Sequence, residues 1–260
     1  MKQPSLFLAH GAPTLVLEHN PYTDFLQNRL SEEISRPTAI VLFTAHFESQ
    51  KQLVSSVSTY TTLYDFVGFP QELYRIQYPA KGDVQLADRI VQAFRTAGVE
   101  AAPQTSRGLD HGAWTVLRLM YPEADIPVVQ LSVNPHLSNA AQYAIGTILE
   151  PLRNDGILII GSGGTTHNLR ALSWDMPQGQ SAPWVEEWES WLGEKVTAWD
   201  MESLFDYEDR GPHAKRAVPR NEHFIPLLLA MGSADGGRRA QQMVRFDEFG
   251  SLALTAWKFS

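Results

Sequence analysis

The sequence of 260 residues contains no cysteine. This absence excludes disulfides, iron–sulfur clusters, thiolate zinc sites and cysteine nucleophiles together, so any metal site has to use His, Asp, Glu or backbone oxygen. Basic residues are also in the minority, because 21 Lys and Arg stand against 29 Asp and Glu and give a formal net charge of -8. Nucleic-acid binding usually requires a basic surface, so this charge balance argues against a nucleic-acid partner.

Long hydrophobic runs are absent as well. No stretch approaches the roughly 18 apolar residues of a membrane-spanning helix. The apolar run at the N-terminus is interrupted by His10, Gly11 and Pro13, which is too early for a secretory signal peptide. We therefore expect a cytoplasmic protein with no membrane partner. No Pro/Gly/Ser-rich linker and no repeat divides the chain, which predicts one domain over residues 1–260.

Short apolar runs alternate with longer segments of helical period, which is typical of a largely parallel sheet covered by helices. Strands are predicted at 4–9, 38–47, 126–133 and 156–163, with an edge strand at 52–60 and a closing hairpin at 243–259. Helices are predicted at 21–34, 84–97, 113–121, 138–154, 181–199 and 221–231. The first of these has Asn20 as N-cap and Pro21 at its first position. The predicted fold class is therefore α/β: a single domain with a mostly parallel central sheet flanked by helices, and a C-terminal hairpin.

Histidines gather at the ends of the predicted elements. His10 and His46 follow apolar strands, His167 follows “LIIGSGGTT”, and His111 precedes a helix. The carboxyl ends of parallel strands meet at one edge of a sheet, where active sites are assembled. His223, in “NEHFIPLL”, would project from the first turn of a late helix that can close over this edge. The sequence therefore places five imidazoles near one pocket.

Each histidine taken singly also fits a plainer role, such as a hydrogen-bonded core side chain, a helix cap, or a pair with the adjacent Asp110 or Glu222. One pocket accounts for all five positions together, so we favour a metal or acid–base site. The remaining histidines are expected to be structural or on the surface: His19, His136 and His213.

Two further patterns are read as structural. The segment “GSGGTT” at 161–166 matches neither the P-loop nor the dinucleotide-binding fingerprint, and we expect its glycines to let backbone come close to a bound ligand. Trp184, Trp188 and Trp191 follow helical spacing, which predicts a core or subunit-contact stripe and leaves an oligomer open.

Five motifs resemble, in order and spacing, those of the 4,5-DOPA extradiol dioxygenase family, which belongs to the class III ring-cleaving dioxygenases related to the protocatechuate 4,5-dioxygenase catalytic subunit. They are “AHGAP” at 9–13, “TAHFES” at 44–49, “LDHGAW” at 109–114, “GSGGTTHNL” at 161–169 and “NEHFIPLL” at 221–228. The resemblance spans nearly the whole chain, and it implies a single catalytic domain that inserts O₂ into a small catechol, with DOPA as one candidate, to give a muconic semialdehyde.

The resemblance also implies roles for the histidines. His10, His46 and His223 would bind one divalent metal ion, with Glu222 as the other candidate for the third ligand. His167 would be the acid/base residue and lies in the family close enough to the metal to be considered a fourth ligand. His111 would contact substrate or oxygen. Three protein ligands on one face leave open positions for catecholate and O₂, which is the logic of iron(II) oxygenases, whereas three imidazoles suit zinc as well.

Two other functions stay open at this point. A zinc-dependent hydrolase could use His167 or Glu222 as general base, although the sequence has no HExxH helix. A non-enzymatic metal-binding interaction protein could share the same fold. Arg107 and Arg170 lie near the motifs and are candidates for binding a substrate carboxylate, or are surface residues.

Overall fold

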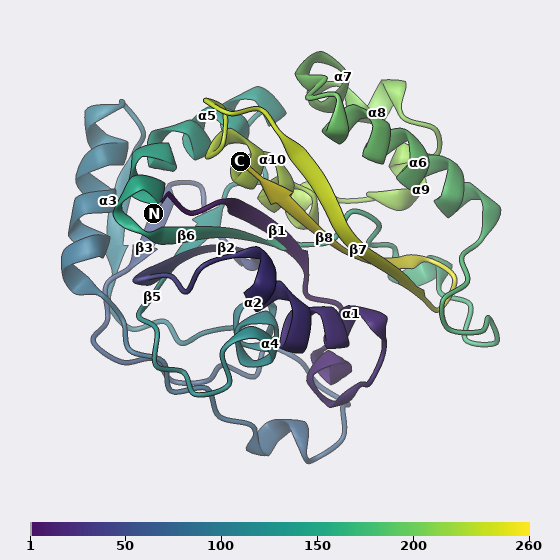
Figure 1. Cartoon of the computed structure of the whole chain (residues 1–260), viewed down its shortest axis with the longest axis horizontal. Helices are drawn as coiled ribbons and strands as arrows, with labels where there is room; N and C mark the ends of the chain where they lie inside the picture. Colours follow the sequence, from purple (N-terminus) through teal and green to yellow (C-terminus); the bar gives the residue numbers. More distant parts are fainter. Residues whose placement is uncertain (1) are drawn as a thin grey trace.

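The computed structural model describes residues 2–260, which form one eight-stranded sheet with the strand order β4-β3-β5-β2-β6-β1-β8-β7 (Figure 1). The strands are β1 (Ser5–Ala9), β2 (Ala39–Glu48), β3 (Gln52–Ser55), β4 (Ala101–Gln104), β5 (Val128–Val133), β6 (Ile157–Gly163), β7 (Ala240–Glu248) and β8 (Leu252–Phe259). The central strands β5, β2, β6 and β1 run parallel, whereas β8 and β7 form an antiparallel pair that continues the sheet beyond β1. The predicted α/β class, with its parallel centre and C-terminal hairpin, is confirmed.

The predicted edge strand at 52–60 is wrong in length and in place. β3 ends at Ser55, and it lies inside the sheet because β4 pairs on its outer side. β4 itself is not predicted, since it is only four residues long and contains Pro103. Proline is tolerated at the edge of a sheet, where its missing N–H is not needed by a neighbouring strand.

The α-helices are α1 (Pro21–Asp24), α2 (Leu30–Glu33), α3 (Val84–Thr96), α4 (His111–Met120), α5 (Asn139–Leu149), α6 (Pro183–Thr197), α7 (Met201–Phe205), α8 (Tyr207–Arg210), α9 (Ala214–Ala217) and α10 (Ile225–Gly232). A π-helical turn, η2 (Phe25–Arg29), joins α1 to α2. The short 3-10 helices are η1 (Pro13–Leu17), η3 (Leu73–Arg75), η4 (Glu150–Asp155), η5 (Leu169–Ala171) and η6 (Asn221–His223). No helix within residues 2–260 is long and apolar enough to cross a membrane.

Several helix boundaries differ from the prediction because of capping side chains and proline. Asn20 caps α1 in a capping box and Pro21 is its first residue, as predicted. α4 begins two residues earlier than expected, because Asp110 accepts a hydrogen bond from the Ala113 N–H and so acts as N-cap. α5 ends at Leu149, and a 3-10 helix containing Pro151 completes the segment predicted as one helix. The short helices α7, α8 and α9 are not predicted.

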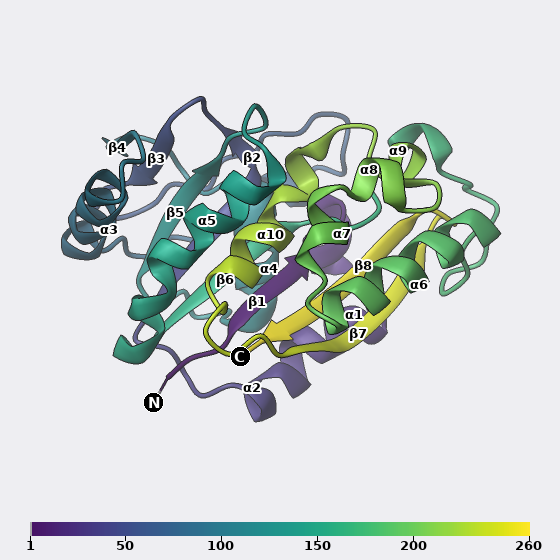
Figure 2. The same ribbon diagram turned by 90° about the horizontal axis from the view of Figure 1, so that it is seen from above.

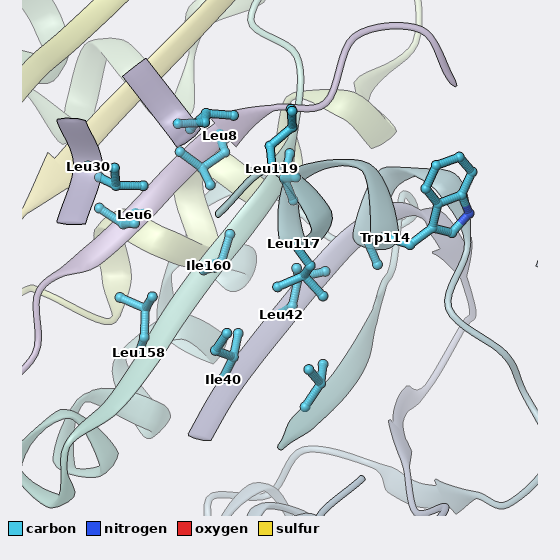
Figure 3. Close-up of a cluster of buried hydrophobic side chains, with 14 of the residues drawn as sticks. Leu6, Leu8, Leu30, Ile40, Leu42, Trp114, Leu117, Leu119, Leu158 and Ile160 are labelled. Carbon is cyan, nitrogen blue, oxygen red and sulfur yellow. The ribbon is translucent and has the colours of Figure 1, made fainter. Parts of the chain in front are cut away.

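Helices cover both faces of the sheet (Figures 1 and 2). α1, α2 and α4 lie on one face, and α3, α5, α10 and α6 lie on the other. Figure 3 shows the hydrophobic core on the face covered by α1, α2 and α4, in which alternate side chains of β1, β2 and β6 contact α4 and α2. Its labelled members are Leu6, Leu8, Leu30, Ile40, Leu42, Trp114, Leu117, Leu119, Leu158 and Ile160. The tryptophans of α6 pack in a core on the opposite face, between α6 and α10, where Trp188 is fully buried.

Candidate metal centre

The carboxyl ends of three parallel strands bring the first two histidines together. His10 directly follows β1, and His46 lies near the end of β2. β6 lies between them, with Ala9 opposite Gly163 on one side and Thr44 opposite Ser162 on the other. The His10 N–H donates to the Gly163 carbonyl at 3.2 Å, so the backbone of β6 fixes where the first imidazole begins.

A third imidazole arrives from the opposite end of the chain. His223 is the last residue of η6, and the Gly164 N–H donates to its carbonyl at 2.9 Å. One ring nitrogen each of His10, His46 and His223 lies within 4.8 Å of the others. The Nε2 atoms of His10 and His46 are 3.0 Å apart, and the buried Nε2 of His223 has no hydrogen-bond partner among residues 2–260. Buried polar atoms are normally satisfied, so this nitrogen marks a place for a ligand.

An oxygen atom lies near the Nδ1 atom of each of these three rings. Ser162 Oγ is 2.9 Å from His10 Nδ1, and Glu222 Oε1 is 2.9 Å from His223 Nδ1. Asp65 Oδ2 lies 3.5 Å from His46 Nδ1. The Ser162 hydroxyl gives its single proton to the Gly112 carbonyl, so it accepts from His10. The close partners of His10 and His223 favour a proton on Nδ1 and leave Nε2 of these two rings free to bind a cation, which is the usual arrangement of metal-binding histidines.

Electrostatics keep these imidazoles neutral. Burial lowers the pKa of His10 and of His223 well below the ordinary value, and the neighbouring imidazoles lower it further. Burial, followed by the charge of His111, lowers the pKa of His46 to about 3. At neutral pH all three therefore present unprotonated nitrogens, the form that binds a metal ion.

His111 and Asp65 form a second layer of the site. His111 opens α4, and both its backbone N–H and its Nδ1 lie 2.9 Å from Asp65 Oδ1. The His111 ring lies 4.1 Å from that of His46, centroid to centroid. Burial alone would raise the pKa of Asp65, but the hydrogen bonds and charge of His111 outweigh it and lower the pKa to about 2. Asp65 is thus an ionised carboxylate within the site, and the sequence analysis did not single it out.

His167 lies at the side of this cluster. Its ring stacks on that of His223, with centroids 3.5 Å apart and an interplanar angle of 9°. It groups by distance with Glu222 and His223, not with the His10 and His46 nitrogens. Burial lowers its pKa. The alternative that His167 caps a helix is wrong, because Asn168 is the N-cap of the short η5 that follows.

The two candidate arginines differ in their contacts. Arg107 donates to the buried Asp110 at 3.1 Å and to the His46 carbonyl at 2.8 Å, and its guanidinium lies 4.4 Å from the centre of the Phe47 ring. Its Nη2 atom therefore supports the backbone of His46, whereas its buried Nε has no hydrogen-bond partner in the part of the chain that the structure describes. Arg170 is exposed on η5. The remaining histidines, His19, His136 and His213, are exposed and lie outside these groups of possible metal ligands.

The glycines of “GSGG” serve a different purpose from the one expected. A Cβ on Gly161 would lie 2.0 Å from the Pro226 carbonyl oxygen, and one on Gly163 would lie 2.1 Å from the His223 carbonyl oxygen. These glycines let the start of α10 and the His223 turn touch β6 directly. The close approach is to the chain's own backbone, where a ligand had been expected.

Comparison with known proteins identifies the origin of this arrangement. Residues 5–255 match the family described as “Catalytic LigB subunit of aromatic ring-opening dioxygenase”. The chain belongs to this family. Among curated LigB-type relatives, 4,5-DOPA dioxygenase extradiol of Beta vulgaris is 38% identical over 98% of this chain and 96% of its own length. The Escherichia coli K12 protein of the same name is 38% identical over 97% of this chain and 93% of its own length.

A solved structure agrees with these relatives. The crystal structure of an uncharacterized Escherichia coli K12 protein superimposes with a TM-score of 0.83 at 34% identity, covering 99% of this chain and all of that one. The LigB chain described here is accordingly a metal-dependent extradiol dioxygenase that opens aromatic rings. Membership implies a divalent metal, an aromatic substrate and O₂.

Proposed function

We propose that His10, His46 and His223 hold one divalent ion, that this ion is iron(II) in the active enzyme, and that the substrate is a small catechol of the DOPA type. The observation that carries the proposal is the convergence of three imidazoles with lowered pKa values, in which Nε2 of His223 has no partner within residues 2–260 and Nε2 of His10 and His46 face each other. Two nitrogens at about 2.1 Å from one ion and about 90° apart are ~3.0 Å from each other. The 3.0 Å between the Nε2 atoms of His10 and His46 fits that geometry.

Glu222 is the less suitable third ligand. Its Oε1 atom is engaged with His223 Nδ1 at 2.9 Å, on the side of the ring away from the unpartnered Nε2. The other carboxylate oxygen is 3.5 Å from Arg220 Nε and has no hydrogen-bond partner among the described residues, so it is the Oε1 contact that disfavours Glu222 as a ligand. Glu222 therefore orients His223 and stabilises its Nδ1 proton, and the imidazole takes the ligand position.

Iron(II) bound by three protein ligands keeps open positions at which a catechol and O₂ react. The chain contributes orientation and proton transfer. His10 and His223 are buried, whereas the His46 side chain is 24% exposed, so substrate approaches from the side of His46. His167, stacked beside His223, takes a proton from the substrate hydroxyl and later returns it, a role that suits an imidazole kept neutral by burial. His111 directs its Nε2 toward oxygen atoms of the reacting groups, because its Nδ1 is held by Asp65.

The substrate class rests on the relatives. Those from Beta vulgaris, Escherichia coli and Mirabilis jalapa are all named 4,5-DOPA dioxygenase extradiol. DOPA carries a catechol ring for the metal and a charged amino-acid side chain for recognition outside it. The exposed Arg170, on the segment that follows His167, is the candidate partner for the substrate carboxylate.

The test is anaerobic loading of metal-free protein with iron(II), followed by DOPA or unsubstituted catechol under air. We expect O₂ uptake together with a visible-absorbing semialdehyde, and faster turnover of DOPA. Zinc-loaded protein is the control, because zinc binds three imidazoles but has no redox chemistry. His223→Ala should retain no iron. Iron retention by this variant, with loss of iron in Glu222→Ala, would reassign the third ligand, and iron-loaded protein without O₂ uptake on any catechol would refute the function.

A further inference from the structure

One carboxylate reaches two histidines of the site from a loop that belongs to no strand or helix. Asp65 lies between β3 and η3, in a segment rich in aromatic residues. Its Oδ1 accepts from the backbone N–H of His111 and lies within hydrogen-bond distance of Nδ1 of the same residue, both at 2.9 Å. Its Oδ2 lies 3.5 Å from His46 Nδ1, an ion-pair distance that is longer than a hydrogen bond. The Asp65 side chain is 20% exposed.

We propose that Asp65 is a positioning residue that sets the tautomers of His46 and His111 together, presenting Nε2 of His46 to the metal and Nε2 of His111 to the substrate. This inference rests on the proposed function, in which His46 is a metal ligand. It deepens that function by naming the residue outside the metal shell that prepares both rings.

The reason lies in what a carboxylate can do. An ionised carboxylate accepts hydrogen bonds but donates none, so a neutral imidazole whose Nδ1 faces it carries its proton on that nitrogen. The lone pair then lies at Nε2. A His46 ring with its proton at Nε2 could not bind an ion through that atom, and partners of this kind fix the tautomer and orientation of metal-binding histidines in general.

Contacts on the other side hold the same arrangement. The Phe66 ring, next along the chain, meets the His111 ring edge to face, with centroids 5.8 Å apart and an angle of 89°. The rings of His46 and His111 lie 4.1 Å apart, so a turn of one would disturb the other. Asp65 and Phe66 thus brace His111 from two directions, and the loop they belong to couples it to His46.

Asp65 could instead serve only to fasten its loop to the start of α4, and Asp65→Asn separates the two roles. The Oδ1 position faces the two donors of His111, so the amide oxygen stays there and the loop remains attached. The amide NH₂ then faces His46 Nδ1, which favours a lone pair on Nδ1 and the proton on Nε2. A pure loop anchor would be almost unaffected by this isosteric change, whereas the metal ligand would be placed in the wrong tautomer.

The experiment measures Zn²⁺ affinity of metal-free protein by competition with a chelating dye. We expect Asp65→Asn to bind Zn²⁺ about 10–100-fold more weakly than wild type, the usual effect of removing such a partner. The matched control is Tyr64→Phe, which removes a loop hydrogen bond from Tyr64 Oη to the Ile76 carbonyl, 2.6 Å long, without touching the histidines. Tyr64→Phe should bind Zn²⁺ like wild type.

A second measurement needs no variant. Long-range ¹H–¹⁵N spectra of Zn²⁺-loaded wild type should show His46 bound through Nε2 with a proton on Nδ1, and His111 with a proton on Nδ1. The inference is overturned if His46 binds through Nδ1, if Asp65→Asn keeps wild-type affinity, or if Tyr64→Phe loses as much. Failure of ring cleavage by the iron-loaded wild type would refute the proposed function alone, because the Zn²⁺ affinities and spectra do not depend on turnover.

Discussion

Replacing Gly163 by alanine should displace one histidine of the proposed metal centre without changing any imidazole. Gly163 ends β6, accepts a hydrogen bond from the His10 N–H, and packs against the His223 turn. An added Cβ would lie 2.1 Å from the His223 carbonyl oxygen, whereas ordinary contacts begin at 3.4 Å, so the two groups must separate by about 1.3 Å. β6 is paired on both sides, with β1 and β2, and cannot retreat. The His223 turn therefore moves.

The expected cost follows from that displacement. Overpacking a well-filled interior costs about 1–3 kcal/mol, which in a chain of this size lowers the melting temperature by roughly 2–12 °C. If about 1.4 kcal/mol of the strain falls on the His223 position, Zn²⁺ affinity drops about tenfold. The assays are thermal unfolding of metal-free protein and Zn²⁺ competition with a chelating dye.

Gly164→Ala is the matched control. Its added Cβ would meet the His167 Cβ at 3.6 Å and the Thr166 carbonyl oxygen at 3.9 Å, both ordinary contacts, and its N–H to the His223 carbonyl is retained. We expect this variant to unfold and to bind Zn²⁺ as wild type does. Equal behaviour of the two alanine variants would show that the close approach at Gly163 does not govern the position of His223, and the reasoning would fail.

Two further predictions concern the histidines. His167→Gln should keep its metal while turnover falls by roughly 10²–10⁴, the usual worth of a positioned acid/base group; loss of metal on elemental analysis would make His167 a fourth ligand instead. In metal-free protein, burial lowers the folded-state pKa of His10, whereas in the unfolded chain its pKa has the ordinary value of about 6.5. As the pH falls below about 6.5, the unfolded chain therefore takes up a proton at His10 that the folded chain does not. Wild type should therefore lose unfolding free energy relative to His10→Gln by up to about 1.4 kcal/mol per pH unit as the pH falls from 6.5 to 5, measured by urea titration. Glu189 and Glu248, whose pKa values burial raises, titrate with the opposite sign and cancel in this comparison, and a constant difference would contradict the prediction.

The part of the site that lies at the ends of parallel strands was predictable from the sequence. Parallel strands deliver their last residues to one edge, so imidazoles after β1 and β2 could be placed together from the apolar runs that precede them. No apolar strand precedes Asp65, and the segment around it has no hydrophobic periodicity, so the sequence does not indicate its position. Its partner His111 comes close to it only through the packing of α4. A side chain that contacts the Nδ1 atom of a histidine from a loop is placed there by the conformation of that loop. A pattern of residue types does not predict this conformation.

The fold shows the same limit. The long apolar strands β2, β5 and β6 were placed to within two residues, whereas the four-residue β4 was missed because its few residues carry little signal. The glycines after residue 160 signalled a close approach, but not its partner. That partner is the His223 turn, far along the chain, and only the completed packing of α10 on β6 reveals it.

The wide spacing of the histidines along the chain bears on when the protein can acquire its ion during synthesis. His10 directly follows β1, the first strand to leave the ribosome, but β1 lies between β6 and β8 in the sheet, and His223 follows β6 in the sequence. A nascent chain that has produced β1 and β2 carries two of the three proposed metal ligands, and β6, the strand that lies between β1 and β2, has not yet been made. With the proposed ligand set, tight metal binding therefore follows the folding of the polypeptide and cannot nucleate it, because the third ligand is in place only after β6 and the His223 turn have docked.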